Sequence, residues 1–257
     1  MALNDVSFPA LQRGKLVVRL ACTESEVRDA QRLRYRAFAH QTNADLGDQV
    51  DVDVFDALSH HVLVLHGDTI VACYRLRLWQ CEEIRFSYTG KYYDLSPLAD
   101  FPKPMLELGR FCVAPDSHDP DVLRLAWAAV TAVVDLNGVG LLFGCTSFHG
   151  ADPRQHAAAL ALLKARIGPD RWRPRPKSAE RVDIANLPTP ISSSRALSSI
   201  PALLRSYLGL GGWVSDHAVI DQAFETLHVF TGVEIDRIPA ERVRALRAIS
   251  AGASGVY

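Results

Sequence analysis

The sequence predicts an α/β protein in which helices flank a mixed central sheet. Strand-like segments alternate with helix-like segments in the order strand-helix, strand-strand, strand-helix, strand-helix, which is the pattern of α/β proteins. Residues 106–113 are apolar on both faces, as expected of a strand inside a sheet. Residues 227–235 form another such run, so we expect the sheet to continue into the C-terminal part of the chain.

Composition narrows the classes of function. Of the 257 residues, 48% are hydrophobic and 22% are charged, which is typical of a globular protein with an ample core. The formal net charge of −1 gives no reason to expect a nucleic-acid partner. The apolar run at residues 123–136 contains Arg124 and Asp135 and is too short to span a membrane. The first residues lack a basic start followed by an apolar run, so no secretory signal is expected.

The cysteines suggest a reducing compartment. They are Cys22, Cys73, Cys81, Cys112 and Cys145. None forms a CxxC pair or a metal-binding spacing with histidine, so we expect no metal site. We interpret them as reduced thiols of a cytoplasmic protein.

The first elements are a strand at Leu16–Leu20 and a helix. Thr23 and Glu26 have the spacing of a capping box, which marks a helix start. Apolar residues then recur at helical spacing up to Phe38. Residues 43–56 are polar and rich in aspartate, which predicts a loop.

A strand pair follows the acidic loop. Residues 61–65 and 69–78 are strand-like and flank a turn around Gly67. Because successive side chains of a strand point to opposite faces, we expect Tyr74 on one face of the second strand and Arg75 on the other.

The strand-helix alternation then continues. The buried strand at residues 106–113 precedes a helix at about residues 121–134, which we expect to start at the Asp119-Pro120 pair. The next two elements are a strand at residues 140–148 and an alanine-rich helix at residues 153–167.

The composition changes after Gly168. Basic residues alternate with prolines, and residues 200–213 resemble a short apolar helix that ends in glycines. A strand at residues 227–235 and a helix at residues 240–249 complete the chain.

Two charged residues interrupt the buried strand at residues 106–113. Glu107 and Arg110 are three positions apart, so on a regular strand their side chains point to opposite faces. A buried charge is costly unless it is paired or used. Each therefore needs a partner elsewhere in the chain, and we expect Arg75 to pair with Glu107 and Asp56 with Arg110.

These partners belong to one constellation of charged positions. Its members are Arg34 on the first helix, Asp53 and Asp56 in the acidic loop, Arg75 on a strand, and Glu107 with Arg110. Their spacing resembles that of the acyl-homoserine lactone synthases. That family has the Gcn5-related N-acyltransferase (GNAT) fold and takes its acyl chain from acyl-carrier protein. The resemblance implies a GNAT-like mixed sheet with a C-terminal extension.

Several short sequence motifs are more similar to those of a sister family, the L-ornithine Nα-acyltransferases, than to those of the lactone synthases. They are LRYRAF, FDALSHHVLVL, IVACYRLRL, YDLSPL, LELGRFCV, LLFGCTSFHGADP and LLRSYLGLGGWVSDHAVID, and they cover roughly residues 16–238. The resemblance implies transfer of a 3-hydroxyacyl chain from acyl-carrier protein to the α-amine of L-ornithine, giving lyso-ornithine lipid. We expect one acyltransferase domain over residues 1–257, with a core at about 16–167 and a C-terminal extension at about 168–257.

The chain departs from that family at two places. It has Ser59-His60-His61 where the family usually has Cys-Asp-His. Residues 114–120 lack the basic Tyr-Arg pair that often follows the strand. The acid at position 60 is missing, so we carry no role over to it. Among the histidines near strand ends, we prefer His149 as a functional residue.

Amide formation from a thioester sets chemical requirements that the charged positions match. The amine must lose a proton, and our candidates for this chemistry are Glu107, as the base, and Arg110. Ornithine also carries a second amine, which is a cation, and a carboxylate. We expect Asp53 or Asp56 to hold the cation and Arg75 or Arg110 the carboxylate. Arg34 and His149 complete the expected substrate-binding set. The alternative is a purely structural network of buried ion pairs.

The loop after Val113 argues against coenzyme A as the donor. Coenzyme-A-dependent members of the fold carry a glycine-rich loop there, and its backbone N–H groups hold phosphates. This chain has aspartate, serine, histidine and proline at that place. We therefore expect no bound cofactor and an acyl donor carried on the phosphopantetheine of acyl-carrier protein.

Acyl-carrier proteins are acidic, so a docking surface for one should be basic. The basic stretch consists of Lys164, Arg166, Arg171, Arg173, Arg175, Lys177 and Arg181. Its alternative is a solvated basic loop. The apolar segment from Leu197 to Trp213 fits an ordinary core helix better, and peripheral contact with a membrane is its alternative. The expected location is the cytoplasm, with peripheral contact at the inner face of the membrane.

Two other functions stay open at this point. An acyl-homoserine lactone synthase would act on S-adenosylmethionine, and the long part of the chain after Gly168 argues against it. A non-catalytic module that binds carrier protein or lipid would keep the fold without turnover. The presence of both Glu107 and Arg110 argues against that module.

Overall fold

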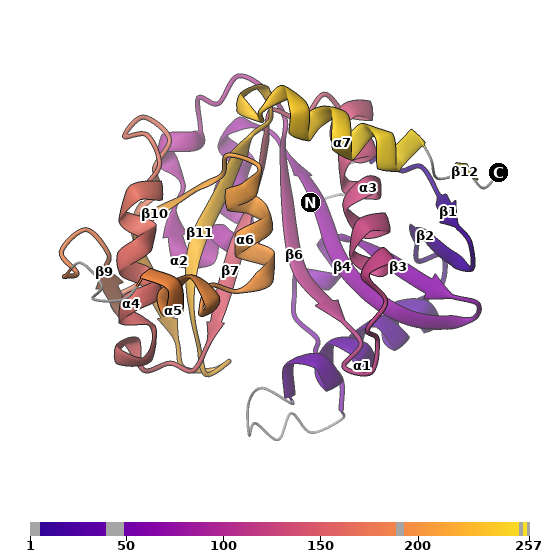
Figure 1. The fold of residues 1–257 in the computed structure, drawn as a ribbon, viewed down its shortest axis with the longest axis horizontal. Coiled ribbons are helices and arrows are strands. Elements are labelled where there is room, and N and C mark those ends of the chain that lie inside the picture. The colour runs from indigo at the N-terminus through magenta and orange to yellow at the C-terminus, as the bar shows by residue number, and fades with distance from the viewer. Residues whose placement is uncertain (1–5, 40–48, 189–192, 252–253, 256–257) are drawn as a thin grey trace. The chain divides into compact units, whose positions relative to one another are not determined.

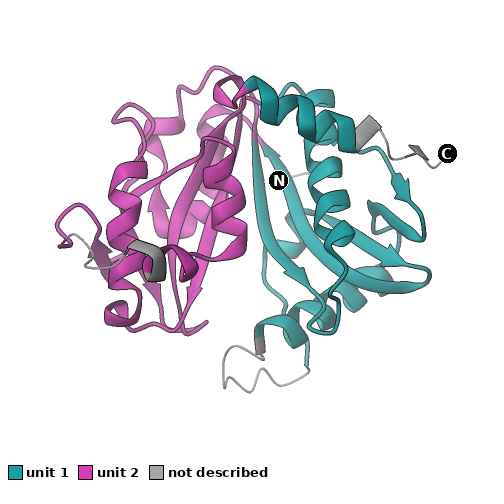
Figure 2. Ribbon diagram, viewed as in Figure 1, with its two compact units in different colours: residues 1–78, 106–139, 240–257 teal, residues 79–105, 140–239 magenta. Residues whose placement is uncertain are grey.

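The computed structural model describes residues 6–39, 49–188, 193–251 and 254–255. The chain divides into two units (Figure 2). Unit 1 comprises Met1–Leu78, Leu106–Val139 and Ala240–Tyr257, and unit 2 comprises Trp79–Met105 and Gly140–Pro239. Each unit combines a sheet with helices, which confirms the prediction of an α/β protein.

The strands of unit 1 follow one another in the order β12-β1-β2-β3-β4-β6. They are β1 (Leu11–Arg13), β2 (Leu16–Leu20), β3 (His60–His66), β4 (Thr69–Trp79), β6 (Met105–Val113) and β12 (Ser254–Gly255). The helices are α1 (Glu24–Ala39), α3 (Pro120–Leu136) and α7 (Ala240–Ala251), with a 3-10 helix at Asp56–Leu58. Helix α7 crosses the C-terminal end of α3 (Figure 1), where Arg247 pairs with Asp135 at 2.9 Å.

Strands β3 and β4 form the predicted antiparallel pair. Gly67 makes the turn between them with a φ of 60°, a left-handed conformation that glycine adopts without a Cβ clash. β3 also pairs with β2 on its other side, so both of its edges are hydrogen-bonded and its apolar residues lie inside the sheet.

Helices α1 and α3 cover opposite faces of this sheet. The Tyr74 hydroxyl of β4 donates a hydrogen bond to the Ala126 carbonyl of α3 at 3.3 Å. The adjacent Cys73 thiol donates to the Ala30 carbonyl of α1 at 3.6 Å. Successive residues of a strand point to opposite faces, so the two helices lie on different sides of β4.

Helix α1 starts where the sequence predicts. The Thr23 hydroxyl accepts a hydrogen bond from the Glu26 N–H at 3.2 Å, which satisfies one N–H of the first turn. The Glu26 carboxylate, expected to complete a capping box, accepts from the Cys22 N–H and from Arg19, both at 2.6 Å. The apolar residues of the helix that pack on the sheet are Ala30, Leu33 and Ala37. Arg34 lies on the same buried side and is 1% exposed.

Helix α3 also starts as predicted. Asp119 accepts a hydrogen bond from the Asp121 N–H at 2.8 Å, and Pro120 occupies the first helical position. Proline suits that position because its missing N–H would have no partner within the helix.

The larger sheet of unit 2 has the strand order β7-β11-β10-β9, with antiparallel neighbours. Its strands are β7 (Leu141–His149), β9 (Arg181–Asp183), β10 (Trp213–Asp221) and β11 (Thr226–Glu234). A separate pair joins β5 (Tyr93–Asp94) to β8 (Arg175–Pro176). The helices are α2 (Tyr88–Tyr92), α4 (Pro153–Leu163), α5 (Ser193–Ser198) and α6 (Ala202–Gly209). The 3-10 helices are Cys81–Phe86, Ser96–Leu98, Lys164–Arg166 and Ile235–Arg237.

Two predictions for the second half of the chain are wrong. The apolar helix expected at residues 200–213 is the shorter α6, and Trp213 begins strand β10. The alanine-rich helix expected to reach residue 167 ends at Leu163 and continues as a 3-10 turn. The strand predicted at residues 227–235 is confirmed as β11.

Two apolar clusters pack on opposite faces of the unit 2 sheet. The first, called here the aromatic core, includes Trp79, Phe101, Phe143, Trp172, Trp213 and Phe230. The second lies with α4, α5 and α6 and includes Phe148, Leu160, Ile200 and Leu204. Phe143 and Phe148 are five positions apart on β7, so they point to different faces.

Trp213 belongs to the interior. It is 7% exposed, and its ring stacks on Phe230 with centroids 5.2 Å apart. The expectation that the segment from Leu197 to Trp213 offers this side chain to a membrane surface is therefore wrong. Among the described residues, no helix has both the length and the apolar character to cross a membrane.

Candidate functional site

Three arginines and three aspartates of unit 1 form a closed ring of alternating charges, called here the charge ring. Around the ring, its members are Arg34, Asp51, Arg110, Asp53, Arg75 and Asp56. Each neighbouring pair is an ion pair, with N···O distances between 2.5 and 3.0 Å. Three positive and three negative charges cancel, so the ring as a whole is neutral.

Arg34 of α1 binds both ends of the acidic segment, Asp51 and Asp56. Its Nε donates to Asp51 at 2.8 Å, and its two terminal nitrogens donate to the Asp56 carboxylate at 2.7 and 3.0 Å. A further bond runs from Arg34 to the Asp51 carbonyl. The planar guanidinium suits this arrangement because its donors form a rigid fork that matches a carboxylate.

The two strand arginines hold the middle of the same segment. Arg75 of β4 contacts both oxygens of Asp53, at 2.5 and 3.1 Å, and also reaches Asp56 at 2.9 Å. Arg110 of β6 pairs with Asp51 and Asp53, both at 3.0 Å. Helix α1, strand β4 and strand β6 therefore all bind the acidic segment.

The segment itself alternates between buried acids and exposed valines. Asp51 is 5% exposed and lies in the ring, whereas Val52 is 54% exposed and Val54 is 78% exposed. Asp53 is the most accessible acid of the ring, with 20% of its side chain exposed. An extended chain presents alternate residues to opposite sides, so the order Asp-Val-Asp-Val puts the acids on one side.

Two neutral side chains support the ring. The Gln31 side-chain amide donates to the Asp56 carboxylate at 3.1 Å, and the Gln31 backbone carbonyl accepts from the Asp51 N–H at 3.1 Å. The His61 Nε2 lies 3.1 Å from the Asp56 carbonyl. Burial, the largest effect, lowers the pKa of His61. Gln31 and His61 thus fix Asp56 from α1 and from β3.

The ring keeps the carboxylates of Asp53 and Asp56 ionised. Burial disfavours the charged form of Asp56, but the hydrogen bond from Arg34 and the charges of Arg34 and Arg75 outweigh it, and its pKa lies well below its usual range. For Asp53 the burial is likewise outweighed by Arg75 and Arg110, and its pKa is lowered. Burial opposes the charge of Arg34 as well, yet Asp56 and Asp51 raise its pKa.

Arg110 has an unusual backbone. Its φ is 52°, in the left-handed region that residues other than glycine seldom adopt. A left-handed residue inside a strand changes the direction of its side chain relative to a regular strand. The predicted pairing of Asp56 with Arg110 is wrong: Asp56 pairs with Arg34 and Arg75, and Arg110 pairs with Asp51 and Asp53.

The structure thus brings together five of the predicted site residues and adds others. Those five are Arg34, Asp53, Asp56, Arg75 and Arg110. Glu107 is on β6, in the same unit, and is 7% exposed; its role as the base stays a prediction. Asp51 and Gln31 were missed. The spacing of Asp51, two positions before Asp53, was the signal that could have revealed the first of them.

The remaining predicted residues lie in unit 2. His149 is the exposed last residue of β7. Arg173 pairs with Asp170 at 2.6 Å and with Asp216 at 3.1 Å. Lys177 donates to the Gly90 carbonyl at 2.5 Å. Part of the basic stretch is therefore engaged within the protein.

In the same stretch, Lys164 donates to the Leu187 carbonyl, and the guanidinium of Arg171 lies over the Trp172 ring at 4.0 Å. Arg166, Arg175 and Arg181 are exposed, as is Arg171. Lys177 is exposed as well, so a partner can reach these four arginines and Lys177.

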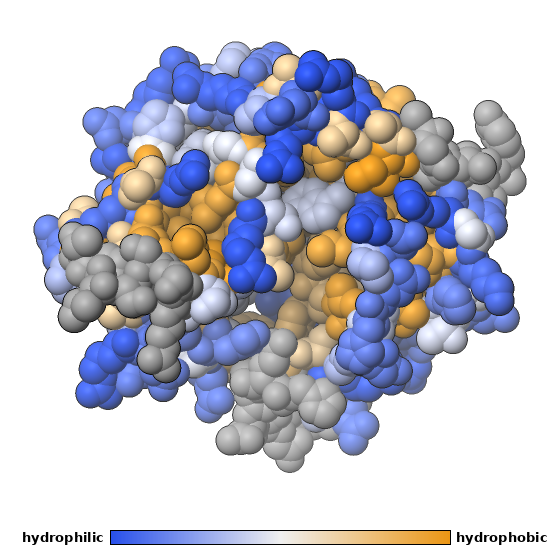
Figure 3. All heavy atoms as spheres, viewed as in Figure 1, coloured by the Kyte–Doolittle hydropathy of each residue, from blue (hydrophilic) through white to orange (hydrophobic). Residues whose placement is uncertain are grey.

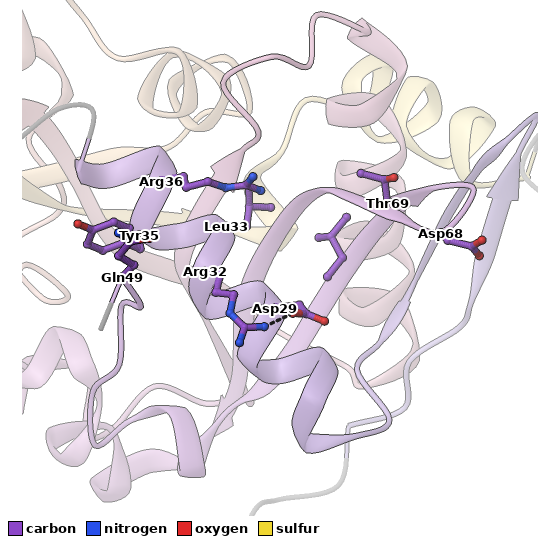
Figure 4. A pocket seen from close by; sticks show the side chains of 9 residues that line it. Asp29, Arg32, Leu33, Tyr35, Arg36, Gln49, Asp68 and Thr69 are labelled. Atoms are coloured by element: carbon purple, nitrogen blue, oxygen red, sulfur yellow. Dashed lines mark hydrogen bonds and ion pairs between the residues drawn. The ribbon is translucent and has the colours of Figure 1, made fainter. Parts of the chain in front are cut away.

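A separate pocket of about 430 Å³ opens beside α1 (Figure 4). Helix α1 contributes Asp29, Arg32, Tyr35 and Arg36, and the turn after β3 contributes Asp68 and Thr69. Arg32 pairs with Asp29 at 2.6 Å inside this group. The residues that line the pocket do not include members of the charge ring, so it is distinct from the ring.

Within the described ranges 6–39, 49–188, 193–251 and 254–255, no group of three or more His, Cys, Asp or Glu side chains could hold a metal ion. The ring aspartates face guanidinium groups, which compete with any cation for the same oxygens.

Comparisons with known proteins agree on one group of enzymes. A family model of the acetyltransferase (GNAT) domain matches residues 33–128, a range that contains Glu107 and the whole charge ring. An L-ornithine N(alpha)-acyltransferase of Brucella abortus (strain 2308) is 34% identical over 249 residues, covering 90% of this chain and 88% of that protein. One from Rhizobium meliloti (strain 1021) is 34% identical over 245 residues, covering 87% and 81%.

Solved structures provide a further comparison. FeeM, an N-acyl amino acid synthase from uncultured soil microbes, aligns with a TM-score of 0.48 at 10% identity, covering 92% of this chain and 97% of that one.

Proposed function

This chain belongs to the L-ornithine N(alpha)-acyltransferase family, and we infer that it is an acyltransferase whose acceptor is L-ornithine. The observation that carries this conclusion is the 34% identity to such enzymes over 90% of the chain. We propose in addition that the donor is a 3-hydroxyacyl chain on acyl-carrier protein and that the product is lyso-ornithine lipid.

The proposed reaction forms one bond and breaks another. The α-amine nitrogen of ornithine attacks the thioester carbonyl, and the C–S bond then breaks to release the phosphopantetheine thiolate, which becomes the free thiol with the proton that leaves the nitrogen. The nitrogen must lose a proton on the way. We assign that proton to the Glu107 carboxylate, which lies on the same strand as ring residue Arg110 and is largely buried.

The charge ring is proposed to hold the acceptor in place. Asp53 is the ring acid with the greatest exposure, at 20% of its side chain, so it is best placed to meet the side-chain ammonium of ornithine. The ornithine carboxylate needs an arginine, and Arg110 is more exposed than Arg75, at 10% against 4% of the side chain. Because Arg110 already pairs with two aspartates, the substrate would share it with them.

The start of α3 supports a donor other than coenzyme A. Phosphates bind at helix N-termini through N–H groups that have no other acceptor. Here the Asp119 carboxylate already accepts from the Asp121 N–H at 2.8 Å. Asp121 adds a second carboxylate in the first turn, where Arg13 and Arg124 pair with it at 3.2 and 2.7 Å. The Asp119 carboxylate competes with a pyrophosphate for the N–H groups of this helix start, which favours an acyl group delivered by a carrier protein.

The proposed carrier-docking surface is in unit 2. Its accessible charges are the exposed arginines Arg166, Arg171, Arg175 and Arg181. An acidic carrier would meet them with complementary charge, which speeds encounter and sets orientation. Arg173 and Lys177, which are also expected to dock the carrier, make contacts within the protein, although Lys177 is exposed.

Peripheral contact with a membrane is a further proposal. Hydrophobic side chains show at the surface of unit 2 around α4 and α6 (Figure 3), and Leu197 of α5 is 54% exposed. An apolar surface of this kind suits the release of a lipid product into a bilayer interface.

A reconstituted assay tests the proposed function. The purified protein is incubated with 3-hydroxyacyl-acyl-carrier protein and L-ornithine, and both free carrier thiol and acyl-ornithine are measured. We expect both products to appear together. The same acyl chain on coenzyme A is the matched donor control and should react far more slowly. Thiol release with S-adenosylmethionine but not with ornithine would overturn the proposal.

A further inference from the structure

His61 on β3 is a buried histidine of unit 1 that supports the charge ring without belonging to it. It is 7% exposed and lies directly across from ring residue Arg75 in the antiparallel pairing of β3 with β4. Residues that face one another in such a pair have their side chains on the same side of the sheet. The imidazole therefore lies on the side of the sheet that carries the ring. At the other edge of β3, the His61 carbonyl accepts a hydrogen bond from the Ala21 N–H at 2.8 Å.

The contact of His61 with the acidic segment determines which imidazole nitrogen carries a hydrogen. The Nε2 lies 3.1 Å from the Asp56 backbone carbonyl, and a carbonyl oxygen can only accept, so Nε2 must be the donor. In the neutral imidazole the Nδ1 then holds a lone pair. Within the described part of the chain, Nδ1 has no hydrogen-bond partner, yet it is not one of the fully buried unpaired nitrogens. It therefore keeps contact with solvent and can take up a proton.

The charges that face His61 come from three elements. Arg34 lies on α1, Arg75 on β4, and Asp56 on the acidic segment. Arg77 lies two positions after Arg75, on the same side of β4. Burial, the largest effect, lowers the pKa of His61; Asp56 opposes it, and Arg34 and Arg75 act with it. The imidazole is therefore neutral near pH 7 and gains its charge only below the ordinary value of 6.5.

A proton on His61 would change the charge balance at the ring. The ring itself is neutral, because three arginines face three aspartates. The added positive charge would lie beside Asp56 and opposite Arg75, which contacts both oxygens of Asp53. A second cation that approaches Asp53 would then be repelled, since charges in a partly buried site are only weakly screened.

We propose that His61 is a positioning residue for the acceptor substrate. Its Nε2 holds the Asp56 carbonyl, and with it the segment that carries Asp53, while a proton on its Nδ1 weakens the binding of the ornithine side-chain ammonium. The inference rests on the proposed function, in which Asp53 meets that ammonium. It adds a residue that tunes the affinity for ornithine with pH.

Two variants separate the hydrogen bond of His61 from its charge. In His61→Gln the side-chain amide nitrogen reaches the position of Nε2, so the bond to the Asp56 carbonyl is kept, but the side chain cannot titrate. In His61→Leu both the bond and the titration are lost. The matched control is His66→Gln, which removes an exposed histidine at the end of the same strand. Thermal unfolding shows that each variant is folded at the pH of the assay.

The measurement is the KM for ornithine at saturating acyl donor, together with the KM for the donor, from about pH 7.5 to about pH 5. Ornithine titrates in the same way in every assay, so its own protonation cancels in the ratio of wild type to variant. At the upper pH, His61→Gln should keep the ornithine KM, and His61→Leu should raise it on the order of tenfold with a smaller change in kcat.

The acid end of the profile tests the charge. As the pH falls, the ratio of the ornithine KM of the wild type to that of His61→Gln should rise on the order of fivefold. The corresponding ratio for the donor KM should stay constant, as should the ornithine ratio for His66→Gln. A residue that only stabilises the fold would change both KM values together.

The outcomes distinguish this inference from the function on which it rests. Failure of the wild type to form acyl-ornithine would overturn the proposed function, and the inference with it. Acyl-ornithine formed with a constant KM ratio between wild type and His61→Gln would overturn the inference alone, as would an equal rise for ornithine and donor. A wild-type ornithine KM in folded His61→Leu would overturn the positioning role, and the comparison with His61→Gln decides the inference even where His61→Leu is unfolded.

Discussion

Arg34 and Asp56 meet through two hydrogen bonds, at 2.7 and 3.0 Å, although 22 positions separate them in the chain. Arg34 is 1% exposed and Asp56 is 9% exposed, so water does little to screen the pair. The same two residues are each bound by other members of the charge ring. The ring is therefore both an anchor for the acidic segment and a set of charges with a fixed geometry.

Removal of Arg34 should be strongly destabilising. In Arg34→Met the carboxylates of Asp51 and Asp56 lose a buried partner, and we expect the free energy of unfolding to fall by about 3–5 kcal/mol. Urea unfolding measures the loss. The control is Arg32→Met on the same helix, where the ion pair with Asp29 is exposed and the loss should be at most about 0.5 kcal/mol. Equal losses would mean that the ring contributes no special stability.

Low pH should lower the free energy of unfolding through the aspartates of the charge ring. The pKa values of Asp53 and Asp56 are lower in the folded protein than the ordinary 3.8, so the unfolded chain binds more protons as the pH falls. Their stabilising contribution is complete above about pH 5 and is lost as the pH falls through 3.8 towards the folded pKa values. Urea midpoints between pH 7 and pH 3 measure this loss. The urea midpoint of Asp53→Asn should fall less between pH 7 and pH 3 than that of the wild type. An equal fall would show that Asp53 does not contribute to the acid sensitivity.

The left-handed backbone of Arg110 predicts a reversed preference between glycine and alanine. Both Arg110→Gly and Arg110→Ala lose the ion pairs, but glycine accepts a positive φ, so the glycine variant should be more stable by about 1 kcal/mol. At Cys112, which is not among the positive-φ residues, Cys112→Ala should be more stable than Cys112→Gly. Thermal unfolding of the four variants tests both comparisons. An alanine variant that is the more stable at position 110 would contradict the strained backbone.

Glu107→Gln should abolish most of the turnover while the protein stays folded. The amide is close in shape to the carboxylate but cannot accept the proton of the amine, and loss of a general base typically costs about 10²- to 10⁴-fold in kcat. Acyl-ornithine formation under saturating donor gives kcat directly. Glu82→Gln changes an exposed glutamate in the same way and should leave kcat unaltered. Wild-type turnover in Glu107→Gln would show that another group is the base.

Charge reversal at single arginines of unit 2 should distinguish residues that dock the carrier protein from residues that stabilise the fold. Arg175→Glu and Arg171→Glu alter exposed side chains and should raise the KM for the carrier protein on the order of fivefold at low salt, with a smaller effect at high salt. Arg173→Glu would place a carboxylate beside Asp170 and Asp216 and should lower stability instead. A KM that stays constant in Arg175→Glu and Arg171→Glu would place the docking surface elsewhere.

Regular elements were predictable from the sequence because their patterns are local. The β3–β4 pair follows from alternation and from the turn at Gly67. Strand β6 follows from its apolar run, and α3 follows from the cap at Asp119. Strand β10 was missed because its register shifts between Val214 and Ala218, and three consecutive polar residues break the alternation there. The glycines before Trp213 were read as the end of a helix, although the strand begins directly after them.

The residues that belong to the site were easier to predict from the sequence than the ion pairs that they form. Arg110 stood out because a charge in an apolar strand needs a partner, and Arg34 and Arg75 stood out through a spacing that resembles the acyl-homoserine lactone synthases. Which aspartate pairs with which arginine depends on the irregular loop and on the left-handed φ of Arg110, and neither follows from periodicity. Asp51 was given no role because the loop has no regular element from which the direction of its side chain could be predicted. The partners of a charge in a loop are set by tertiary structure.

The alternation of acids and valines in the acidic segment limits how its length can vary. Asp51 and Asp53 lie in the charge ring, while Val52 and Val54 are exposed. An insertion or deletion of a single residue between Asp51 and Asp53 would turn one of the two aspartates away from the guanidinium groups. Substitutions at the two valines should therefore be tolerated, whereas a change in the number of residues between Asp51 and Asp53 should not be.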